Sequence, residues 1–272
     1  MYDAPTISSL QNPTIRELVR LRDNRNRQRA RVVLVDGARE SERAIDAGLK
    51  LKSIFLVDVN KPEVARLANR SPSSVVQVSE AVLQKIAFGQ HHRDVVALFE
   101  EPRRELSALK LSPQPLVIIL DAVEKPGNIG AVLRSADAVG ADAVVLCEPA
   151  CDLFNPSVIR SSLATVFSVP VAQADRASTM QWVAAHGMTA VTARVDADAE
   201  YWDTDFAQPV AIVIGSEADG LGSHWFANPT SSLRSIGVRI PMSGSADSLN
   251  ASVSAALLMF EAKRQRVKGS LA

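Results

Sequence analysis

Three clusters of polar residues carry side chains that could do chemistry, and each cluster follows an apolar, strand-like segment. Asn128 and Arg134 lie in "LDAVEKPGNIGAVLRSADAVGAD", Glu217 lies in "VAIVIGSEADGLG", and Ser248 and Asn250 come after "VRIPMSGS". Amides, hydroxyls and a guanidinium bind anions, stabilise developing negative charge and orient a substrate. Ligands of open parallel sheets bind beyond the carboxyl ends of the strands, so we expect a site where the three clusters meet.

Each cluster also has a purely structural interpretation. Asn128 could cap a tight turn, and Arg134 could be an ordinary surface side chain. Glu217 could accept hydrogen bonds from backbone N–H groups of its own loop, which is slightly favoured over catalysis. Asn250 could simply cap the terminal helix, at about even odds with a functional role. Taken singly, the clusters leave these alternatives open.

Several classes of function lack their sequence signatures. Gly127 and Gly130 do not form the order G-x-G-x-x-G, which argues against a nicotinamide-dependent oxidoreductase on a doubly wound sheet. The loop around Glu217 lacks the G-K-[ST] ending of a phosphate loop, which argues against nucleotide hydrolysis. Cys147 and Cys151 have no adjacent histidine, so we interpret them as reduced, structural thiols and expect no metal site.

The elements that must position the clusters alternate along the chain. Beyond residue 115, six apolar strands alternate with helices, and a long helix begins at about Asn250. Apolar strands of this kind are buried on both faces, so the sequence predicts an α/β fold with a parallel sheet covered by helices. The strands are "LVIIL", "AVVLCE", "SVPVA", "TAVTARV", "PVAIVIG" and "SIGVRIPM", and "NPSVIRSSLA" is predicted as a single helix.

The first hundred residues predict a separate small α/β domain. Its first helix opens with Pro13 in "PTIRELVRLRD", and four strand-like segments follow. The charged, proline-containing stretch "EPRRELSALKLSPQP" then interrupts the pattern. We therefore expect one domain at 1–105, a linker at 106–114 and a second domain at 115–272.

Positive charge is concentrated in the predicted N-terminal domain. Residues 1–105 carry 18 Lys/Arg against 14 Asp/Glu, a net charge of +4 in a chain of net charge zero. Clustered arginines match phosphate oxygens, so we expect a phosphate-binding face on this domain, although a solvated helix face is the alternative. Phe88 and the segment His91–Arg93 could add stacking or phosphate contacts. The candidate phosphate-binding residues are Arg20, Arg22, Arg25, Arg27, Arg29 and Arg160.

The three clusters, in this order, resemble the three motifs of the SpoU (TrmH) class of RNA ribose 2′-O-methyltransferases, in the SPOUT superfamily. Asn128 and Arg134 match the first motif, Glu217 with its glycines the second, and Ile240–Met242 with Ser248–Asn250 the third. "RSSLATVF" resembles the segment between the first two motifs, except that Ala164 stands where glycine is usual. "ISSLQNPTIRELVRLRD…VVLVDGARESERAI" resembles the family's substrate-binding domain, so the resemblance covers nearly the whole chain.

The resemblance implies a deep C-terminal trefoil knot, S-adenosylmethionine as cofactor, and a homodimer, and the reduced cysteines favour the cytoplasm. Ribosomal and transfer RNA are both substrates in this class, and the separate N-terminal domain favours ribosomal RNA, which would bind through the arginines of that domain and Arg160. The resemblance places methyl transfer to a ribose 2′-hydroxyl of structured RNA on Asn128, Arg134, Ser248 and Asn250. It places cofactor contacts on Thr192, Ala193, Ile214, Gly215, Glu217, Ile240, Met242 and Leu249. Neither a metal nor a membrane is implied.

Two alternatives stay open within the same fold. A knotted RNA-binding protein without turnover would keep the cofactor pocket but transfer no methyl group. An antibiotic-resistance rRNA methyltransferase would share every motif, and nothing in the sequence separates it from a housekeeping enzyme.

Overall fold

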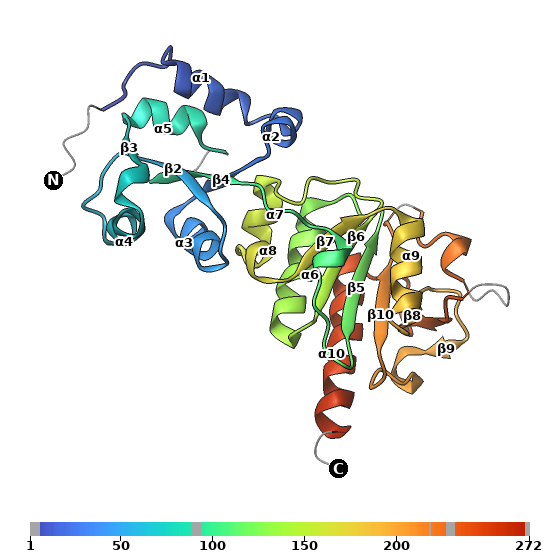
Figure 1. The fold of residues 1–272 in the computed structure, drawn as a ribbon. Coiled ribbons are helices and arrows are strands. Elements are labelled where there is room, and N and C mark those ends of the chain that lie inside the picture. Colours follow the sequence, from blue (N-terminus) through green and yellow to red (C-terminus); the bar gives the residue numbers. More distant parts are fainter. Residues whose placement is uncertain (1–5, 89–93, 218, 227–231, 270–272) are drawn as a thin grey trace. The chain divides into compact units, whose positions relative to one another are not determined.

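The computed structural model describes residues 6–88, 94–217, 219–226 and 232–269. The chain divides into two compact units: Met1–Arg103 with Phe154–Ser168, and Arg104–Leu153 with Val169–Ala272 (Figure 1). None of the helices within the described ranges combines the length and the apolar composition that crossing a membrane requires. The division predicted from sequence at 1–105, 106–114 and 115–272 stays a prediction about independently folding domains.

The first unit contains a mixed four-stranded sheet in the order β1-β4-β2-β3. Strand β4 runs antiparallel to both β1 and β2, whereas β2 and β3 are parallel. The strands are β1 (Val32–Asp36), β2 (Leu51–Leu56), β3 (Val75–Gln77) and β4 (Val95–Glu100). The helices are α1 (Pro13–Arg20), α2 (Asn24–Ala30), α3 (Ala38–Asp46), α4 (Pro62–Arg70), α5 (Glu80–Ile86), α7 (Pro156–Ser161) and α8 (Thr165–Ser168), with the 3₁₀ helix η1 (Pro72–Ser74).

The predicted first helix is present as α1, and its sequence explains its position. Pro13 occupies the first turn, and the Asn12 side chain accepts a hydrogen bond of 3.0 Å from the Thr14 N–H. Ile15 and Leu18, three residues apart, are buried in the core of the first unit.

The helix predicted over "NPSVIRSSLA" is wrong in extent, because α7 ends at Ser161. Leu163 and Ala164 adopt the left-handed region, with φ values of 51° and 65°, before α8 begins. The Ala164 N–H donates to the Ile159 carbonyl at 2.8 Å, which closes the end of α7. Left-handed backbone favours glycine, so the alanine at 164 is held there against its conformational preference.

The second unit contains a seven-stranded sheet in the order β7-β6-β5-β10-β8-β11-β9, and all of its strand pairs are parallel. This confirms the predicted α/β fold with a parallel sheet. The strands are β5 (Leu116–Asp121), β6 (Ala143–Cys147), β7 (Val171–Ala174), β8 (Thr189–Ala193), β9 (Ala199–Glu200), β10 (Val210–Ile214) and β11 (Ser235–Arg239). The two-residue strand β9 was not expected, because it is too short to carry an apolar pattern.

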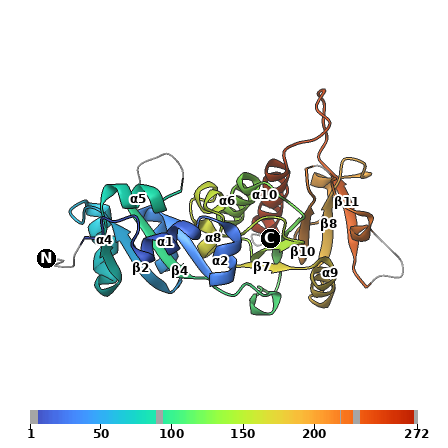
Figure 2. The ribbon, with the colours of Figure 1, turned by 90° about the horizontal axis from the view of Figure 1, so that it is seen from above.

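Helices cover both faces of this sheet, as buried parallel strands require. Figure 2 shows α6 and α10 on one face and α9 on the other, and α10 packs against both α6 and β10. The helices of this unit are α6 (Pro126–Val139), α9 (Arg176–Ala185) and α10 (Ala251–Gly269), with the 3₁₀ helices η2 (Leu106–Ala108), η3 (Tyr201–Asp203) and η4 (Ser223–Trp225).

A buried carboxylate joins β5 to two other segments of the second unit. Asp121, the last residue of β5, is 3% exposed and accepts hydrogen bonds from Arg176 Nε at 3.2 Å and Nη2 at 3.0 Å. It also accepts one of 2.7 Å from the indole N–H of Trp225, a fully buried side chain. Asp121 therefore holds the start of α9 and the helix η4 against the carboxyl end of β5.

We predict that Asp121→Ala destabilises the protein by about 3–5 kcal/mol, because the variant leaves a buried indole N–H and a guanidinium without their acceptor. Urea denaturation followed by tryptophan fluorescence measures the change. The control is Glu100→Ala, which removes an exposed carboxylate that lies 2.8 Å from Lys50 Nζ. A control variant destabilised as much as Asp121→Ala would contradict the assigned role of Asp121.

Candidate active site

A cavity in the second unit has a volume of about 590 Å³ and opens at the carboxyl ends of β8, β10 and β11. This volume lies within the range of small-molecule sites. Segments that follow these three strands, with Lys125 before α6, form the wall. Of the residues predicted from sequence, Ala193, Ile214, Gly215, Glu217, Ile240, Met242, Ser248, Leu249 and Asn250 lie in the lining.

The loop after β10 folds back tightly on its own start. The Gly220 N–H donates to the Ser216 carbonyl at 3.0 Å, and the Asp219 N–H donates to Ser216 Oγ at 3.0 Å. This turn brings the Gly220 carbonyl so close to Gly215 that a Cβ on Gly215 would lie 2.2 Å from its oxygen. Only glycine fits at 215, and the loop presents Glu217 to the cavity as a result.

The structure brings the three polar clusters together. Asn128, in the first turn of α6, donates through Nδ2 to the carboxylate of Glu217 in the loop after β10. Asn250 Nδ2 donates to Asn128 Oδ1 at 3.2 Å. Asn250 Oδ1 in turn accepts hydrogen bonds from the N–H of Ser252 at 2.9 Å and from its hydroxyl at 2.7 Å. Asn250 is therefore both a cap of α10 and a member of the cluster, so the two alternatives left by the sequence are compatible.

Arg134 does not join this cluster. It follows Asn128 by six residues on α6, and a rotation of about 100° per residue turns it to a different face. Its side chain is exposed, and within the described ranges it makes no hydrogen bond or ion pair. The guanidinium is consequently free to contact a ligand from solution.

Thr192 lies outside the cavity lining, although the family resemblance placed a cofactor contact there. Its side chain is fully buried, and its hydroxyl donates to the Ile236 carbonyl at 3.1 Å. This hydrogen bond links β8 to β11, so the side chain holds two strands together beneath the cavity.

Sequence reasoning missed Arg194, which lines the cavity beside Ala193. Its guanidinium makes two hydrogen bonds of 2.9 Å to Asp196, which raises the pKa of Arg194, and its Cζ lies 3.7 Å from the centre of the Phe226 ring. The spacing R-x-D after a strand is too common to signal such an arrangement.

The arginines of α1, α2 and the residues between them divide into two kinds. Arg20, Arg22, Arg25 and Arg29 are exposed, whereas Arg27 is 3% exposed. Arg27 Nη1 donates to the carbonyls of Leu21 and Arg22, at 2.9 Å each. Arg27 therefore joins the two helices, and this burial gives no support to its predicted contact with RNA. The segment His91–Arg93, which we also considered for RNA contact, lies outside the described residues.

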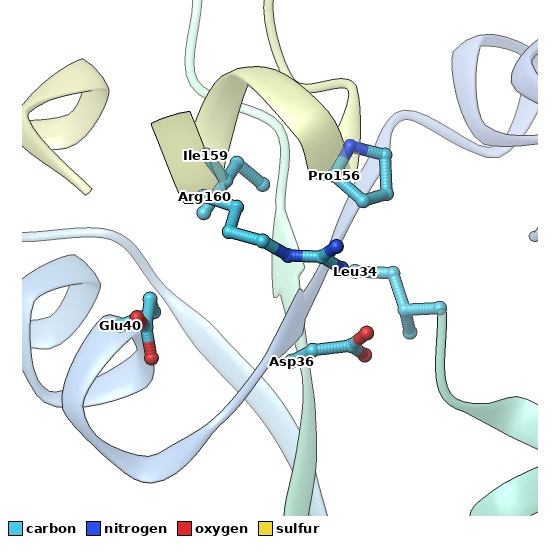
Figure 3. Close-up of a pocket in the computed structure, with 6 residues that line it drawn as sticks. All are labelled: Leu34, Asp36, Glu40, Pro156, Ile159 and Arg160. Atoms are coloured by element: carbon cyan, nitrogen blue, oxygen red, sulfur yellow. The ribbon is translucent and has the colours of Figure 1, made fainter. Parts of the chain in front are cut away.

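Arg160 lies within the first unit. Figure 3 shows its side chain extending from α7 toward Leu34 and Asp36 of β1, and these residues line one small pocket with Glu40. Arg160 Nη2 also lies 3.4 Å from the Phe88 carbonyl, to which it donates. The residue is exposed, so a contact with RNA and this packing role are compatible.

The two cysteines are unsuited to nucleophilic catalysis. Burial raises the pKa of Cys147 to about 12 and that of Cys151 to about 11, so both are thiols at neutral pH. Within the part of the chain that the structure describes, no group of three or more His, Cys, Asp or Glu side chains is arranged to hold a metal ion. The polar groups of the cavity are thus amides, hydroxyls, carboxylates and two cations.

Comparisons with known proteins agree with the fold and with the cavity. Residues 115–260 match the SpoU rRNA Methylase family, and residues 12–97 match the MRM3-like substrate binding domain. The chain is 34% identical to a 23S rRNA (uridine(2479)-2'-O)-methyltransferase of Streptomyces viridochromogenes, over 92% of this chain and 88% of that one.

Solved structures resemble the chain over nearly its whole length. The crystal structure of an RNA 2'-O ribose methyltransferase has a TM-score of 0.82 and 40% identity, and covers 97% of this chain and 100% of its own. The structure of an AdoMet-bound rRNA methyltransferase from Sinorhizobium meliloti has a TM-score of 0.85 and 28% identity. The match covers 96% of this chain and 97% of that one. The chain therefore belongs to the SpoU rRNA methylase family.

Proposed function

We propose that this protein transfers the methyl group of S-adenosylmethionine to a ribose 2′-hydroxyl of ribosomal RNA. The observation that carries the proposal is the junction of the three family motifs at one cavity, through the hydrogen bonds between Glu217, Asn128 and Asn250. Two relatives that match the chain over most of its length are named as 23S rRNA 2'-O-methyltransferases, which favours ribosomal over transfer RNA.

The cavity suits the proposed cofactor in size and in chemistry. A volume of about 590 Å³ accommodates a nucleoside joined to an amino acid. Ile214, Ile240 and Leu249 contribute apolar surface to the wall, and Asp219 contributes negative charge. S-adenosylmethionine would supply an electrophilic methyl group on a positively charged sulfur. Ala193, Gly215 and Met242 complete the proposed contact set, whereas Thr192 would act only through the backbone that it holds.

Positioning of the 2′-oxygen is the main catalytic task that the proposal assigns to the protein. Ser248 and Asn250 lie just before the N-terminal end of α10, in the cavity wall, and would orient the ribose. Arg134 is a poor general base, because a guanidinium stays protonated at neutral pH and has no lone pair to accept a further proton. We propose that Arg134 binds the neighbouring phosphate and stabilises the negative charge that develops on the attacking oxygen. This role fits its side chain, which is exposed and makes no hydrogen bond or ion pair within the described residues.

The RNA would bind through the first unit, which matches a substrate-binding domain over residues 12–97. Arg20, Arg22, Arg25 and Arg29 expose their side chains there, and such arginines bind phosphate oxygens. Arg160 remains a candidate phosphate contact, and Arg27 would contribute by holding α1 and α2 together. We propose a cytoplasmic location, and a ribosomal substrate would support it.

We also propose that the second unit forms a homodimer through α10, and that its C-terminal segment carries the trefoil knot of the family. Support for the dimer comes from an apolar stripe on α10 that water would otherwise contact. Val253, Leu257, Phe260 and Val267 follow helical spacing, and their side chains are 46%, 37%, 52% and 47% exposed.

The function is tested by tritium transfer from labelled S-adenosylmethionine to unmethylated RNA that is separated into ribosomal and transfer fractions. We expect label in ribosomal RNA at one site that resists alkaline cleavage. Arg134→Ala should lower the rate by about 100-fold or more, because it removes stabilisation of the attacking oxygen, while cofactor affinity stays within about threefold. Cofactor binding without transfer by the wild-type protein would instead favour the non-catalytic RNA-binding alternative.

Gly215→Ala should abolish cofactor binding, because its methyl group would overlap the Gly220 carbonyl and open the loop after β10. Isothermal titration calorimetry with S-adenosylmethionine measures the loss. Gly244→Ala is the matched control, since a Cβ at Gly244 meets nothing within 4 Å. Equal affinity of Gly215→Ala and wild type would disprove the proposed position of the cofactor.

Leu257→Asp combined with Phe260→Asp should convert the proposed dimer into a monomer, because it places charge in the apolar stripe. Sedimentation equilibrium gives the mass of each species. Lys110→Glu changes charge at an exposed residue outside α10 and should leave the dimer intact. A wild-type protein that sediments as a monomer would refute this part of the proposal.

A further inference from the structure

Glu217, Asn128 and Asn250 form a chain of hydrogen bonds in which every donor and acceptor points in one direction. Asn128 donates to Glu217, Asn250 donates to Asn128, and Ser252 donates to Asn250. We propose that Glu217 is a positioning residue, whose carboxylate sets the orientation of both asparagine amides and so aligns Asn250 with the ribose. This inference rests on the proposed methyltransferase function and deepens it.

The two ends of the chain fix its direction. An ionised carboxylate only accepts hydrogen bonds, so Asn128 must present its NH₂ group to Glu217 and its oxygen to Asn250. A backbone N–H only donates, so Asn250 must present its oxygen to Ser252 and its NH₂ group to Asn128. Both requirements select the same pair of amide orientations, and turning either amide over would break two hydrogen bonds.

The middle of the chain is shielded from water. The Asn128 side chain is 9% exposed, so an amide that lost Glu217 would have little access to a replacement acceptor. Leaving a buried polar group unpaired is more costly than losing an exposed hydrogen bond. A change at Glu217 is therefore expected to reorient Asn128 rather than leave it in place.

The far end of the chain reaches the cavity. Asn250 lines the cavity beside Ser248, and its contact with Asn128 uses one of the two hydrogens on Nδ2. The second hydrogen remains for a bound group. The oxygen of Asn250 holds the start of α10, so a turned amide would lose both this cap and the donor that faces the ligand.

Glu217 also lines the cavity, so the competing explanation is a direct contact between its carboxylate and the cofactor. The two explanations differ in whether the negative charge must lie at position 217. A positioning role requires only that the side chain at 128 forms a hydrogen bond with the side chain at 217 while it still accepts one from Asn250. A direct contact requires the carboxylate itself beside the cofactor.

The test exchanges the carboxylate and the amide between the two positions. Asn128→Asp sets two carboxylates against each other and should lower kcat by about 100-fold or more, the scale of losing a preorganised donor. Adding Glu217→Gln restores the direction, because the new amide at position 217 donates to the new carboxylate at position 128, which still accepts from Asn250. We expect the double variant to recover at least about tenfold in kcat over Asn128→Asp, with the Kd for S-adenosylmethionine unchanged within about threefold.

The control is Glu105→Gln, which makes the same chemical change at an exposed carboxylate outside the cavity lining. A double variant whose kcat is as low as that of Asn128→Asp, or lower, would overturn the proposal. A Kd that weakens in parallel with kcat in Glu217→Gln would overturn it as well and would make Glu217 a cofactor ligand.

A second measurement does not depend on turnover. Nuclear magnetic resonance of the side-chain amides should show a shifted Asn250 NH₂ signal in Glu217→Ala, although no hydrogen bond joins these two residues in the described structure. An unmoved Asn250 signal would overturn the proposed chain. A wild-type protein that methylates no RNA would refute the proposed function, and the Asn250 signal would still decide the chain by itself.

Discussion

The pairing of β5 with β10 is the constraint on which the rest of the second unit depends. The two strands are parallel and adjacent, with Leu120 opposite Ile214, so their carboxyl ends lie together at one edge of the sheet. Asn128 and Glu217 are 89 residues apart in sequence, and they meet because the segments after these strands start side by side. The third segment reaches the same edge because α10 packs against both α6 and β10.

Two different kinds of interaction hold this edge in place. Asp121 is buried, and its carboxylate accepts hydrogen bonds from the guanidinium of Arg176 and the indole of Trp225. Gly215 acts at the surface, where the absence of a side chain allows two backbone segments to touch. The first kind fixes strands and helices, and the second fixes the shape of a loop. Both leave the amides and hydroxyls of the motifs available for a ligand, which is why the site combines a rigid base with polar groups at its mouth.

Charge in the first unit serves two purposes that the sequence does not distinguish. Arg22 and Arg27 both place their guanidinium carbons within 6 Å of the centre of the Phe88 ring, at 5.8 and 5.6 Å. Arg27 is buried and satisfies backbone carbonyls, whereas its neighbours Arg25 and Arg29 face solvent. An arginine-rich segment therefore contains both structural and ligand-accessible cations, and only the fold assigns each residue to one kind.

The sequence by itself determined the α/β class, the parallel sheet of the second unit, and the family with its three motifs. It did so because buried parallel strands require continuous apolar runs, and because a site at strand ends requires polar residues directly after those runs. The order of the strands, the break between α7 and α8, the roles of Arg27 and Thr192, and the place of Arg194 were decided by the tertiary structure. Each of these depends on which distant segment comes within a few ångströms, and local patterns of hydrophobicity carry no information about that partner. The direction of hydrogen bonding from Asn250 to Glu217 belongs to the same group, because the sequence supplies the amides and only their contacts orient them.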